Sequence, residues 1–195
     1  MPRRIIDFET PDRFATGTVG EPGDRTFFLQ AVQGLRVTTV QLEKEQVAVL
    51  ADRVLAVIDE VERRGLAAMD AGAAGIVDER PLEQPLQEEF RVGTMVIAWD
   101  EDVDRLIVEA RSMTFDAGAG EAARRDGDDD DEDIPDDAPI GPDVLRVRLT
   151  PYMAQQFARR ANSVVAGGRP TCPYCGQVLE RTGHFCHRQF DDLVH

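Results

Sequence analysis

Before residue 172, this chain of 195 residues contains neither cysteine nor histidine. Its three cysteines and three histidines all lie between residues 172 and 195. Without a histidine, the longer part of the chain has no Ser-His-Asp triad and no Cys-His pair. It also lacks the Gly-x-Gly-x-x-Gly fingerprint and the Gly-Lys-Ser/Thr loop that bind nucleotide phosphates. These constellations of hydrolases and nucleotide-binding enzymes are therefore excluded from that part.

Long hydrophobic runs are missing as well. No segment approaches the ~18 consecutive apolar residues of a membrane helix. The N-terminus, MPRRIIDFETPDR, has no apolar stretch after its two arginines, unlike a signal peptide. Two of the three cysteines form a Cys-x-x-Cys pair, which suits metal ligation in a reducing compartment better than a disulfide scaffold. We therefore expect a cytoplasmic protein without membrane contact.

Basic residues are outnumbered, since 22 lysines and arginines face 37 acidic residues and the net charge is −15. The excess is concentrated in nine acids: Asp126, Asp128, Asp129, Asp130, Asp131, Glu132, Asp133, Asp136 and Asp137. Neither this run nor the mildly acidic remainder offers the basic surface that phosphate contacts require, so nucleic acid is not expected as a partner. We expect the acidic insert, about 116–140, to be disordered because it has few apolar residues to bury. It would serve as a partner contact, as a nucleic-acid mimic or only as a solvated loop.

Alternating hydrophobicity predicts strands in both halves of the chain. The EPGD sequence of residues 21–24 is typical of a hairpin turn, and the runs around it are rich in β-branched and aromatic residues. The predicted strands cover residues 13–20, 25–33, 35–42, 89–100, 104–113 and 144–149. Residues 66–88, rich in alanine, glycine and proline, are expected to connect the two halves.

A change to helical periodicity predicts one helix after each group of three strands. In residues 43–64 an apolar stripe recurs at steps of three and four and ends before Gly65: Val47, Leu50, Val54, Ile58 and Val61. The second helix has Thr150 as a suitable N-cap and Pro151 at its first position. Its expected apolar face consists of Met153, Phe157, Ala161 and Val164, and Gly167 and Gly168 end it.

The two halves look like copies of one unit. Phe14, Gly17 and Thr18 match Phe90, Gly93 and Thr94, and Gly34, Val37, Val40 and Leu42 match Gly141, Val144, Val147 and Leu149. The alternative is that two such segments share these positions by chance. We predict an α+β fold of duplicated β-β-β-α units with an antiparallel sheet and two packed helices, plus a C-terminal zinc knuckle. The predicted body spans residues 1–168, with copies at about 5–65 and 89–167, and the zinc-binding tail spans 169–195.

The tail carries the pattern of a structural zinc site. Cys172 and Cys175 lie in a Cys-Pro-x-Cys-Gly turn, and the sequence returns with Gly-His-Phe-Cys, which contains His184 and Cys186. Two thiolates three residues apart can bind one ion, and tetrahedral zinc needs four ligands. We therefore expect one structural Zn²⁺ per chain, bound by Cys172, Cys175, His184 and Cys186.

Other interpretations of the tail stay open. His187 is an alternative fourth ligand, although its position next to Cys186 requires a tighter bend, and His195 lies at the chain terminus. A redox-active Cys-x-x-Cys is expected at a strand-to-helix junction, whereas this pair follows a Gly-Gly break after a helix. A catalytic zinc usually has three protein ligands and an open position, whereas this set is complete.

The body offers weaker candidates. Glu101 and Asp102 are a carboxylate pair in a predicted hairpin turn, where exposure to solvent is the expected outcome. Phe90 and Trp99 are expected to pack between sheet and helix. The arginines Arg146, Arg148, Arg159 and Arg160 would form either a small anion-binding patch or, as we expect, ion pairs with the acidic body.

Taken whole, the sequence resembles an actinobacterial family of proteins of unknown function. The resemblance covers the full length and includes FLQAVQG, the helix QLEKEQVAVLADRV and the terminal CPYCG with GHFC. In that family the chain typically ends in CPxCG followed by GHxCPR, and His187 stands here where proline is usual. The resemblance implies a zinc site and an intracellular bacterial setting, and it implies no activity.

Two functions are compatible with these features. The first is a non-catalytic adaptor or regulatory protein whose zinc knuckle and acidic insert contact another protein. The second is a small-ligand-binding protein or enzyme that uses the body, with zinc only structural. An apolar pocket between the two copies, lined by convergent polar groups, would favour the second function.

Overall fold

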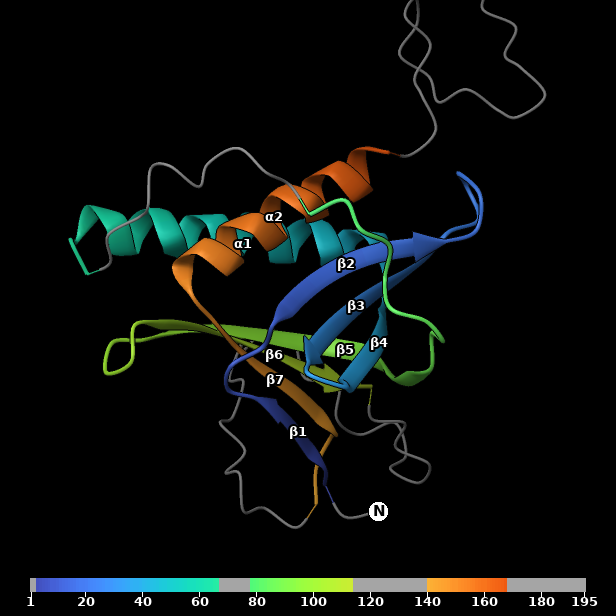
Figure 1. Ribbon diagram of the computed structural model, residues 1–195, viewed down its shortest axis with the longest axis horizontal. Coiled ribbons are helices and arrows are strands. Elements are labelled where there is room, and N and C mark those ends of the chain that lie inside the picture. The colour runs from blue at the N-terminus through green and yellow to red at the C-terminus, as the bar shows by residue number, and fades with distance from the viewer. Residues whose placement is uncertain (1–2, 67–77, 114–139, 168–195) are drawn as a thin grey trace, which may run out of the picture.

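The computed structural model describes residues 3–66, 78–113 and 140–167, which form an α+β fold (Figure 1). Strands and helices alternate in groups along the chain. Their bounds are β1 Ile5–Phe8, β2 Arg13–Val19, β3 Thr26–Gln33, β4 Arg36–Leu42, α1 Lys44–Arg63, β5 Glu88–Asp100, β6 Arg105–Ser112, β7 Val144–Leu149 and α2 Pro151–Ala166. Every strand and helix predicted from the sequence is present, and β1 is an additional strand that the pattern did not predict.

The sheet has seven strands in the order β1-β7-β6-β5-β4-β3-β2. It is mixed, and the prediction of an antiparallel sheet is wrong at two places. Strands β4 and β5 are parallel, as are β1 and β7. The first case arises because α1 and the residues after it carry the chain back between β4 and β5, so both strands run in the same direction. The second is the pairing of β1, which adds to the edge of β7 and runs in the same direction.

The sheet is strongly curled. In a flat sheet of seven strands, the edge strands would be about 29 Å apart. The edge strands here are β1 and β2, yet the chain passes from Phe8 to Arg13 in five steps, which span at most about 18 Å. Arg36, at the start of β4, also reaches β1: its guanidinium lies 4.3 Å from the centre of the Phe8 ring, and Nη1 donates to the Asp7 carbonyl at 2.8 Å. The curl therefore brings the two edges together.

Both helices pack on the same face of the sheet and against each other (Figure 1). The predicted apolar stripe of α1 is confirmed, since all five of its residues are buried. In α2 the buried residues are Ala154, Phe157, Ala158, Arg160 and Ala161, while Met153 and Val164 pack against the core at partial exposure. Because α2 packs mainly on β2, the helix of the second group of elements covers a strand of the first.

The helix ends follow local chemistry. Glu43 is the N-cap of α1 and forms a capping box with Gln46, which was not predicted. The amide of Gln46 also donates to the carbonyls of Val92 and Gly93 at 3.2 and 3.1 Å, where β5 shifts register between Val92 and Thr94. The predicted N-cap of α2 is confirmed, since the hydroxyl of Thr150 accepts the Met153 amide at 3.2 Å. Gln46 therefore ties the start of α1 to the irregular point of β5.

The acidic insert and the cysteine-containing tail lie outside the described residues, apart from Ile140 at the end of the insert. Among the described residues, no helix has the length and apolar character to cross a membrane.

Candidate functional site

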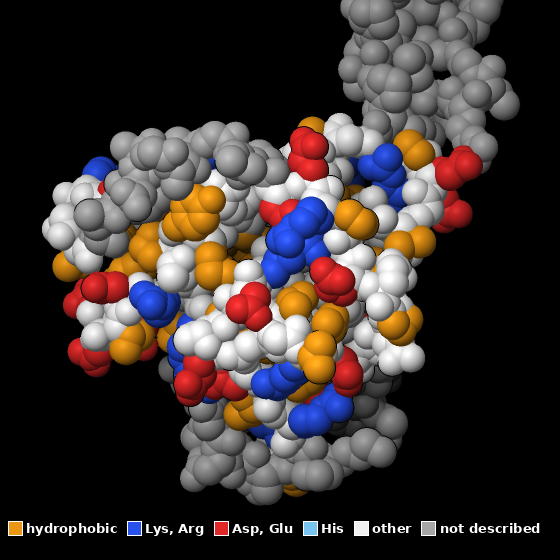
Figure 2. All heavy atoms as spheres, viewed as in Figure 1, with side chains coloured by type: hydrophobic (Ala, Val, Ile, Leu, Met, Phe, Trp, Pro, Cys, Tyr) orange, Lys and Arg blue, Asp and Glu red, His pale blue; other side chains and the backbone are white. Residues whose placement is uncertain are grey.

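A cavity of about 450 Å³ opens between β2, the first turns of α2 and the segment 78–80. It lies between a strand of the first β-β-β-α group and the helix of the second. Its lining residues are Asp12, Arg13, Phe14, Asp78, Glu79, Arg80, Tyr152, Met153, Gln156, Phe157 and Arg160. In Figure 2 basic side chains come to the surface in this region, with acidic and hydrophobic side chains beside them.

One part of the cavity wall is apolar. Phe14 points from β2 toward α2, and its ring lies 4.6 Å from the ring of Phe157 at an interplanar angle of 36°. Both rings are almost fully buried, and Met153 lies nearby on the first turn of α2. Aromatic side chains that alternate on a strand and recur along a helix stripe meet when the helix covers that strand. The packing of α2 on β2 therefore creates this wall.

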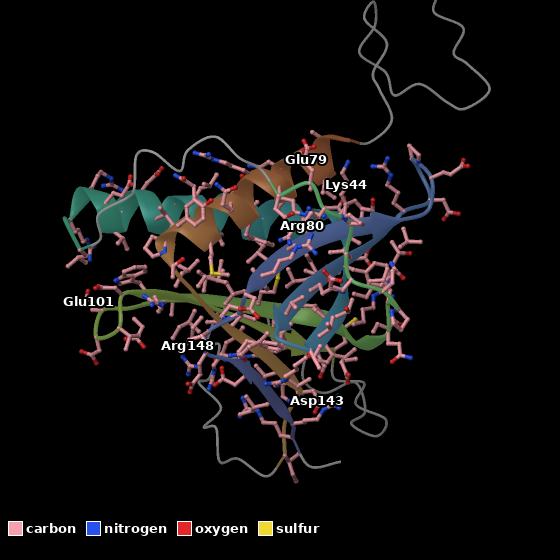
Figure 3. The ribbon with its side chains drawn as sticks, in the orientation of Figure 1. Lys44, Glu79, Arg80, Glu101, Asp143 and Arg148 are labelled. Atoms are coloured by element: carbon pink, nitrogen blue, oxygen red, sulfur yellow. The ribbon has the colours of Figure 1, made fainter. Side chains whose placement is uncertain are left out.

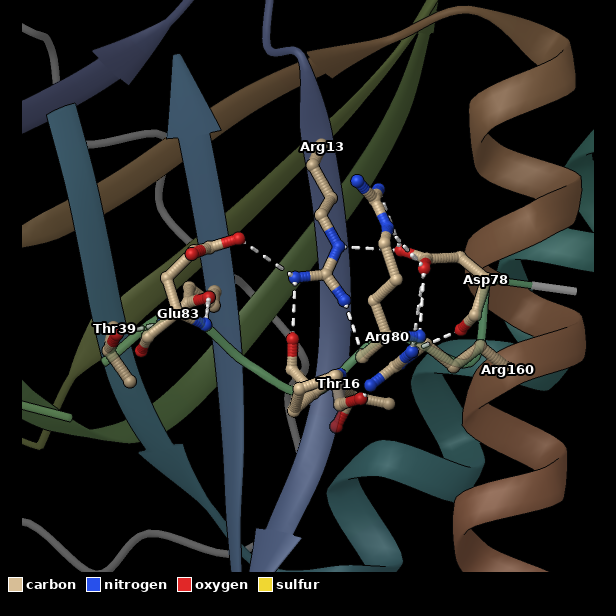
Figure 4. Close-up of polar contacts among 9 residues, drawn as sticks. Arg13, Thr16, Thr39, Asp78, Arg80, Glu83 and Arg160 are labelled. Atoms are coloured by element: carbon tan, nitrogen blue, oxygen red, sulfur yellow. Dashed lines mark hydrogen bonds and ion pairs between the residues drawn. The ribbon is translucent and has the colours of Figure 1, made fainter. Parts of the chain in front are cut away.

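Arg13 is buried in the cavity wall and all three of its guanidinium nitrogens are occupied (Figure 4). Nε contacts Oδ2 of Asp78 at 2.5 Å, Nη1 donates to the Pro81 carbonyl at 2.9 Å, and Nη2 donates to the Arg80 carbonyl at 2.7 Å. A second carboxylate, that of Glu83, lies 3.6 Å from Nη1. Arg13 therefore fastens the segment 78–83 to β2.

Arg160 reaches the same segment from α2. Its Nε donates to the carbonyl of Thr16 at 2.6 Å, and its Nη1 donates to the main-chain carbonyl of Asp78. Strand β2 is an edge strand, so the Thr16 carbonyl has no neighbouring strand on its outer side, and Arg160 satisfies it there. Burial lowers the pKa of Arg160, and the positive charges of Arg13 and Arg80 lower it further.

Asp78 is the carboxylate on which these arginines converge (Figure 4). Besides Arg13, the Nε of Arg80 contacts its Oδ1 at 2.8 Å, and Nη1 of Arg160 lies 4.0 Å from the same oxygen. Burial raises the pKa of Asp78, but hydrogen bonds from Arg80 and Arg13 outweigh it and hold that pKa far below the ordinary value. Asp78 is therefore an anion throughout the physiological range.

The segment continues around the edge of β2 to the face of the sheet that carries no helix. Gln30 on β3 donates to the carbonyl of Glu83 at 3.1 Å and accepts the Glu83 amide at 2.8 Å. Gly17 on β2 faces Leu82, where a Cβ on the glycine would lie 2.9 Å from Cγ of the leucine. Residues 78–83 therefore wrap around the edge strand β2 and contact both of its faces. The cavity lies between the start of this segment, residues 78–80, and α2.

The predicted zinc ligands, Cys172, Cys175, His184 and Cys186, lie outside the described residues, as do His187 and His195. Within the described ranges, no group of three or more His, Cys, Asp or Glu side chains is placed to hold a metal ion. The zinc site at Cys172, Cys175, His184 and Cys186 therefore stays a prediction from the sequence.

The other candidates from the sequence have the expected structural roles. Glu101 and Asp102 are exposed in the turn between β5 and β6. Phe90 and Trp99 pack against the core. On the sheet face opposite the helices, Arg146 pairs with Glu109 at 2.6 Å and Arg148 pairs with Asp7 at 2.6 Å, so the expectation of ion pairs is confirmed for these two arginines.

Sequence reasoning missed the cavity residues Arg13 and Asp78, and it named Arg160 only as a member of a small anion-binding patch or, as expected, of ion pairs with the acidic body. One signal was available for Arg160. It follows Phe157 by three positions and precedes Val164 by four, so it lies within the apolar stripe of α2. A charged residue at such a position is buried only when it has partners. No comparable signal identifies Asp78, because its buried partners Arg13 and Arg160 come from distant segments.

Comparisons with known proteins give a family and no activity. The search of the curated proteins and the search of the solved structures found no match. A family model described as a protein of unknown function (DUF3090) matches residues 6–186, which include the whole described sheet after Ile5, both helices and the predicted zinc ligands. The chain therefore belongs to this family of proteins of unknown function.

Proposed function

We propose that this protein binds a small organic ligand in the cavity between β2 and α2. The observation that carries the proposal is the cavity itself. It measures about 450 Å³ and combines an aromatic wall with buried arginines that converge on Asp78. Binding sites for small molecules are typically concave and mostly apolar, with a few placed polar groups, and have volumes of roughly 300–1,000 Å³.

The position of the cavity favours ligand binding over the adaptor function. From the sequence, a pocket between the two β-β-β-α groups would distinguish a ligand-binding protein from an adaptor. This cavity lies between β2 of the first group and α2 of the second. The element order β2-β3-β4-α1 followed by β5-β6-β7-α2 also supports duplication of one unit. A site between two copies would have arisen where their surfaces meet.

We also propose that the tail holds one structural zinc ion through Cys172, Cys175, His184 and Cys186, as the ligand spacing supports. The ion would stabilise the tail and take no part in chemistry at the cavity. The confinement of all thiols to this site supports a cytoplasmic location. The adaptor function has support from the tail and the acidic insert alone, so it ranks second.

The first test is a thermal-shift screen of the full-length protein against a library of cellular metabolites. A ligand at about 100 times its Kd stabilises the folded state by about 2.7 kcal/mol. For a protein of this size that corresponds to a rise of about 5–10 °C in the midpoint. We expect at least one metabolite class to give such a shift.

Met153→Trp fills the cavity and provides the specificity control, because Met153 lines it from the first turn of α2. Asn162→Trp, at an exposed position of the same helix, is the matched variant. The shift should disappear in the first variant and persist in the second. If no metabolite shifts the midpoint, or if Met153→Trp responds like the parent, the cavity is not a ligand site.

A further inference from the structure

Resting on the proposed function, we infer that the ligand is an organic anion, with a carboxylate or phosphate group attached to a planar apolar body. In the cavity, guanidinium groups that are not fully balanced by contacting carboxylates lie beside an aromatic wall. An anion with an apolar body satisfies both features at once.

Among the described side chains in contact within 4 Å, three guanidiniums at the cavity face two carboxylates, which leaves a positive excess of one charge. Three guanidiniums, those of Arg13, Arg80 and Arg160, contact or approach the carboxylate of Asp78, and the only further carboxylate within 4 Å of them among the described residues is that of Glu83. Arg13 and Arg160 are both buried, with exposures of 6% and 7%. Burial and the two neighbouring arginines also lower the pKa of Arg160, although the carboxylates of Asp78 and Glu79 act in the opposite direction. Because a buried charge without full compensation is costly, an anion in the cavity would be stabilised.

Two of the arginines are available to a ligand. Arg13 uses every guanidinium nitrogen to hold the segment 78–83. Arg160 uses Nε and Nη1 for carbonyl groups, and its Nη2 has no hydrogen-bond partner among the described residues. Arg80 has an exposed side chain that contacts only Asp78 among the described side chains. Arg160 would therefore receive the anion inside the cavity, and Arg80 would approach it from the surface. Figure 3 shows Arg80 where the segment 78–80 passes between α2 and β2.

The first turn of α2 adds to the positive potential. Tyr152 and Met153 belong to this turn and line the cavity, and the turn contains no acidic residue that would neutralise the helix dipole. The N-terminal end of a helix favours an anion in its neighbourhood. Tyr152 is 43% exposed, so it lies on the solvent side of the cavity lining.

The remaining acids of the lining are directed elsewhere or lie at the surface. Asp12 accepts the Gly34 amide through Oδ2 at 2.6 Å, which holds its carboxylate toward the turn between β3 and β4. Glu79 is exposed, and its charge acts on Arg160 from the surface, where solvent screens it in part. The inner wall is therefore formed by the arginines and the aromatic rings, and the rings of Phe14 and Phe157 would contact the ligand's apolar body.

The test uses four probes that share a naphthalene body: 2-naphthoate, 2-naphthyl phosphate, 2-naphthalenemethanol and 2-naphthylmethylamine. Each is titrated into the full-length protein by calorimetry at 50 and 500 mM NaCl. We expect the two anions to bind at least tenfold more tightly than the alcohol and the amine. Their affinity should fall at high salt, whereas the affinity of the neutral alcohol should change little.

Arg80→Gln provides the residue-level test, because Arg80 is exposed and its loss removes one donor to Asp78 but leaves the hydrogen bonds of the buried Arg13 and Arg160. It should weaken 2-naphthoate binding at least fivefold and leave 2-naphthalenemethanol binding unchanged. Arg53→Gln is the matched control, since Arg53 is an exposed arginine on α1 and does not line this cavity. It should leave both affinities unchanged.

The outcomes separate this inference from the proposed function. If the alcohol or the amine binds as tightly as the anions, or if neither anion binds up to its solubility limit, the anion assignment is wrong, while a metabolite hit that Met153→Trp abolishes still supports a ligand site. An equal loss of affinity for 2-naphthoate and 2-naphthalenemethanol in Arg80→Gln would also overturn the assignment. If no metabolite shifts the thermal midpoint and none of the four probes binds, both the anion assignment and the proposed ligand-binding function are wrong.

Discussion

At the scale of residues, Asp78 connects three segments that are distant in the sequence. Its carboxylate contacts Arg13 of β2 and Arg80 of its own segment, and its carbonyl accepts Arg160 of α2. A carboxylate held by two charged donors is stabilised in its ionised form, and its removal leaves the buried Arg13 with only the more distant carboxylate of Glu83. Asp78 therefore organises the cavity and stabilises the fold around it.

This role predicts a specific dependence of stability on pH. The pKa of Asp78 in the folded state lies below its ordinary value of 3.8, so the unfolded chain takes up a proton at a higher pH than the folded protein does. The stabilisation is complete above about pH 5 and is lost progressively as the pH falls further. The thermal midpoint of the parent should therefore fall more steeply between about pH 5 and pH 3 than that of Asp78→Asn.

Asp59→Asn is the control, because Asp59 is an exposed carboxylate on α1. Its midpoint should follow that of the parent at every pH. Parallel curves for the parent and Asp78→Asn would show that the carboxylate is not held by the arginines.

At the scale of elements, each helix is defined by its stripe, its cap and its final residue. Gly65 takes a φ of +68° directly after α1, a conformation that glycine adopts without steric cost. Thr150 and Pro151 begin α2 as their side chains favour. These signals act within a few residues, so the sequence was sufficient to predict both helices. The capping box of Glu43 and Gln46 is also local and was overlooked, whereas the hydrogen bonds of Gln46 to β5 depend on a distant strand.

The two stripes predict where truncation is costly. Leu50 on α1 and Phe157 on α2 are each 1% exposed in the core. Removing either side chain to alanine leaves a cavity and should lower the free energy of unfolding by about 2–5 kcal/mol in chemical denaturation. Val49, adjacent to Leu50 but 54% exposed, is the matched control. Val49→Ala should change stability by no more than about 0.5 kcal/mol, and an equal loss at positions 49 and 50 would contradict the packing of α1.

At the scale of the whole molecule, the described body and the cysteine-containing tail are distinct in chemistry. The body has a continuous core of sheet and helices and contains no cysteine or histidine. The tail contains every thiol and every imidazole in the chain. If the tail holds zinc as proposed, the metal would stabilise it, because binding free energy at such sites is largely folding free energy.

We therefore predict about one zinc ion per purified chain, measured by elemental analysis. Cys175→Ala should abolish stoichiometric zinc, and His184→Ala should weaken its retention much more than His187→Ala or His195→Ala. Chelation should leave the far-ultraviolet circular dichroism of the body's strands and helices largely unchanged, because none of the proposed ligands lies in them. Absence of zinc from the parent would rule out the site, and loss of zinc in His187→Ala alone would assign the fourth ligand to His187.

The sequence by itself was enough to predict the elements, since the periodicity of a strand or helix and the chemistry of its caps are local properties. Both helices and the strands from β2 to β7 were predicted from patterns spanning fewer than about 25 residues. The proposed zinc ligands come from the same kind of local pattern. Strand β1 was missed because four residues with a partly apolar pattern carry little signal until β7 pairs with them.

The tertiary structure decided how those elements meet. The parallel pairs β4-β5 and β1-β7, the curl that joins the edge strands and the packing of α2 on β2 all depend on contacts between distant segments. The same contacts bring Arg13, Asp78 and Arg160 together, although of the three only Arg160 has a sequence signal of burial, its place in the apolar stripe of α2. Burial gives these residues their significance, because a charge inside a protein persists only beside its partners. The cavity, and with it the proposed function, is a property of the folded chain.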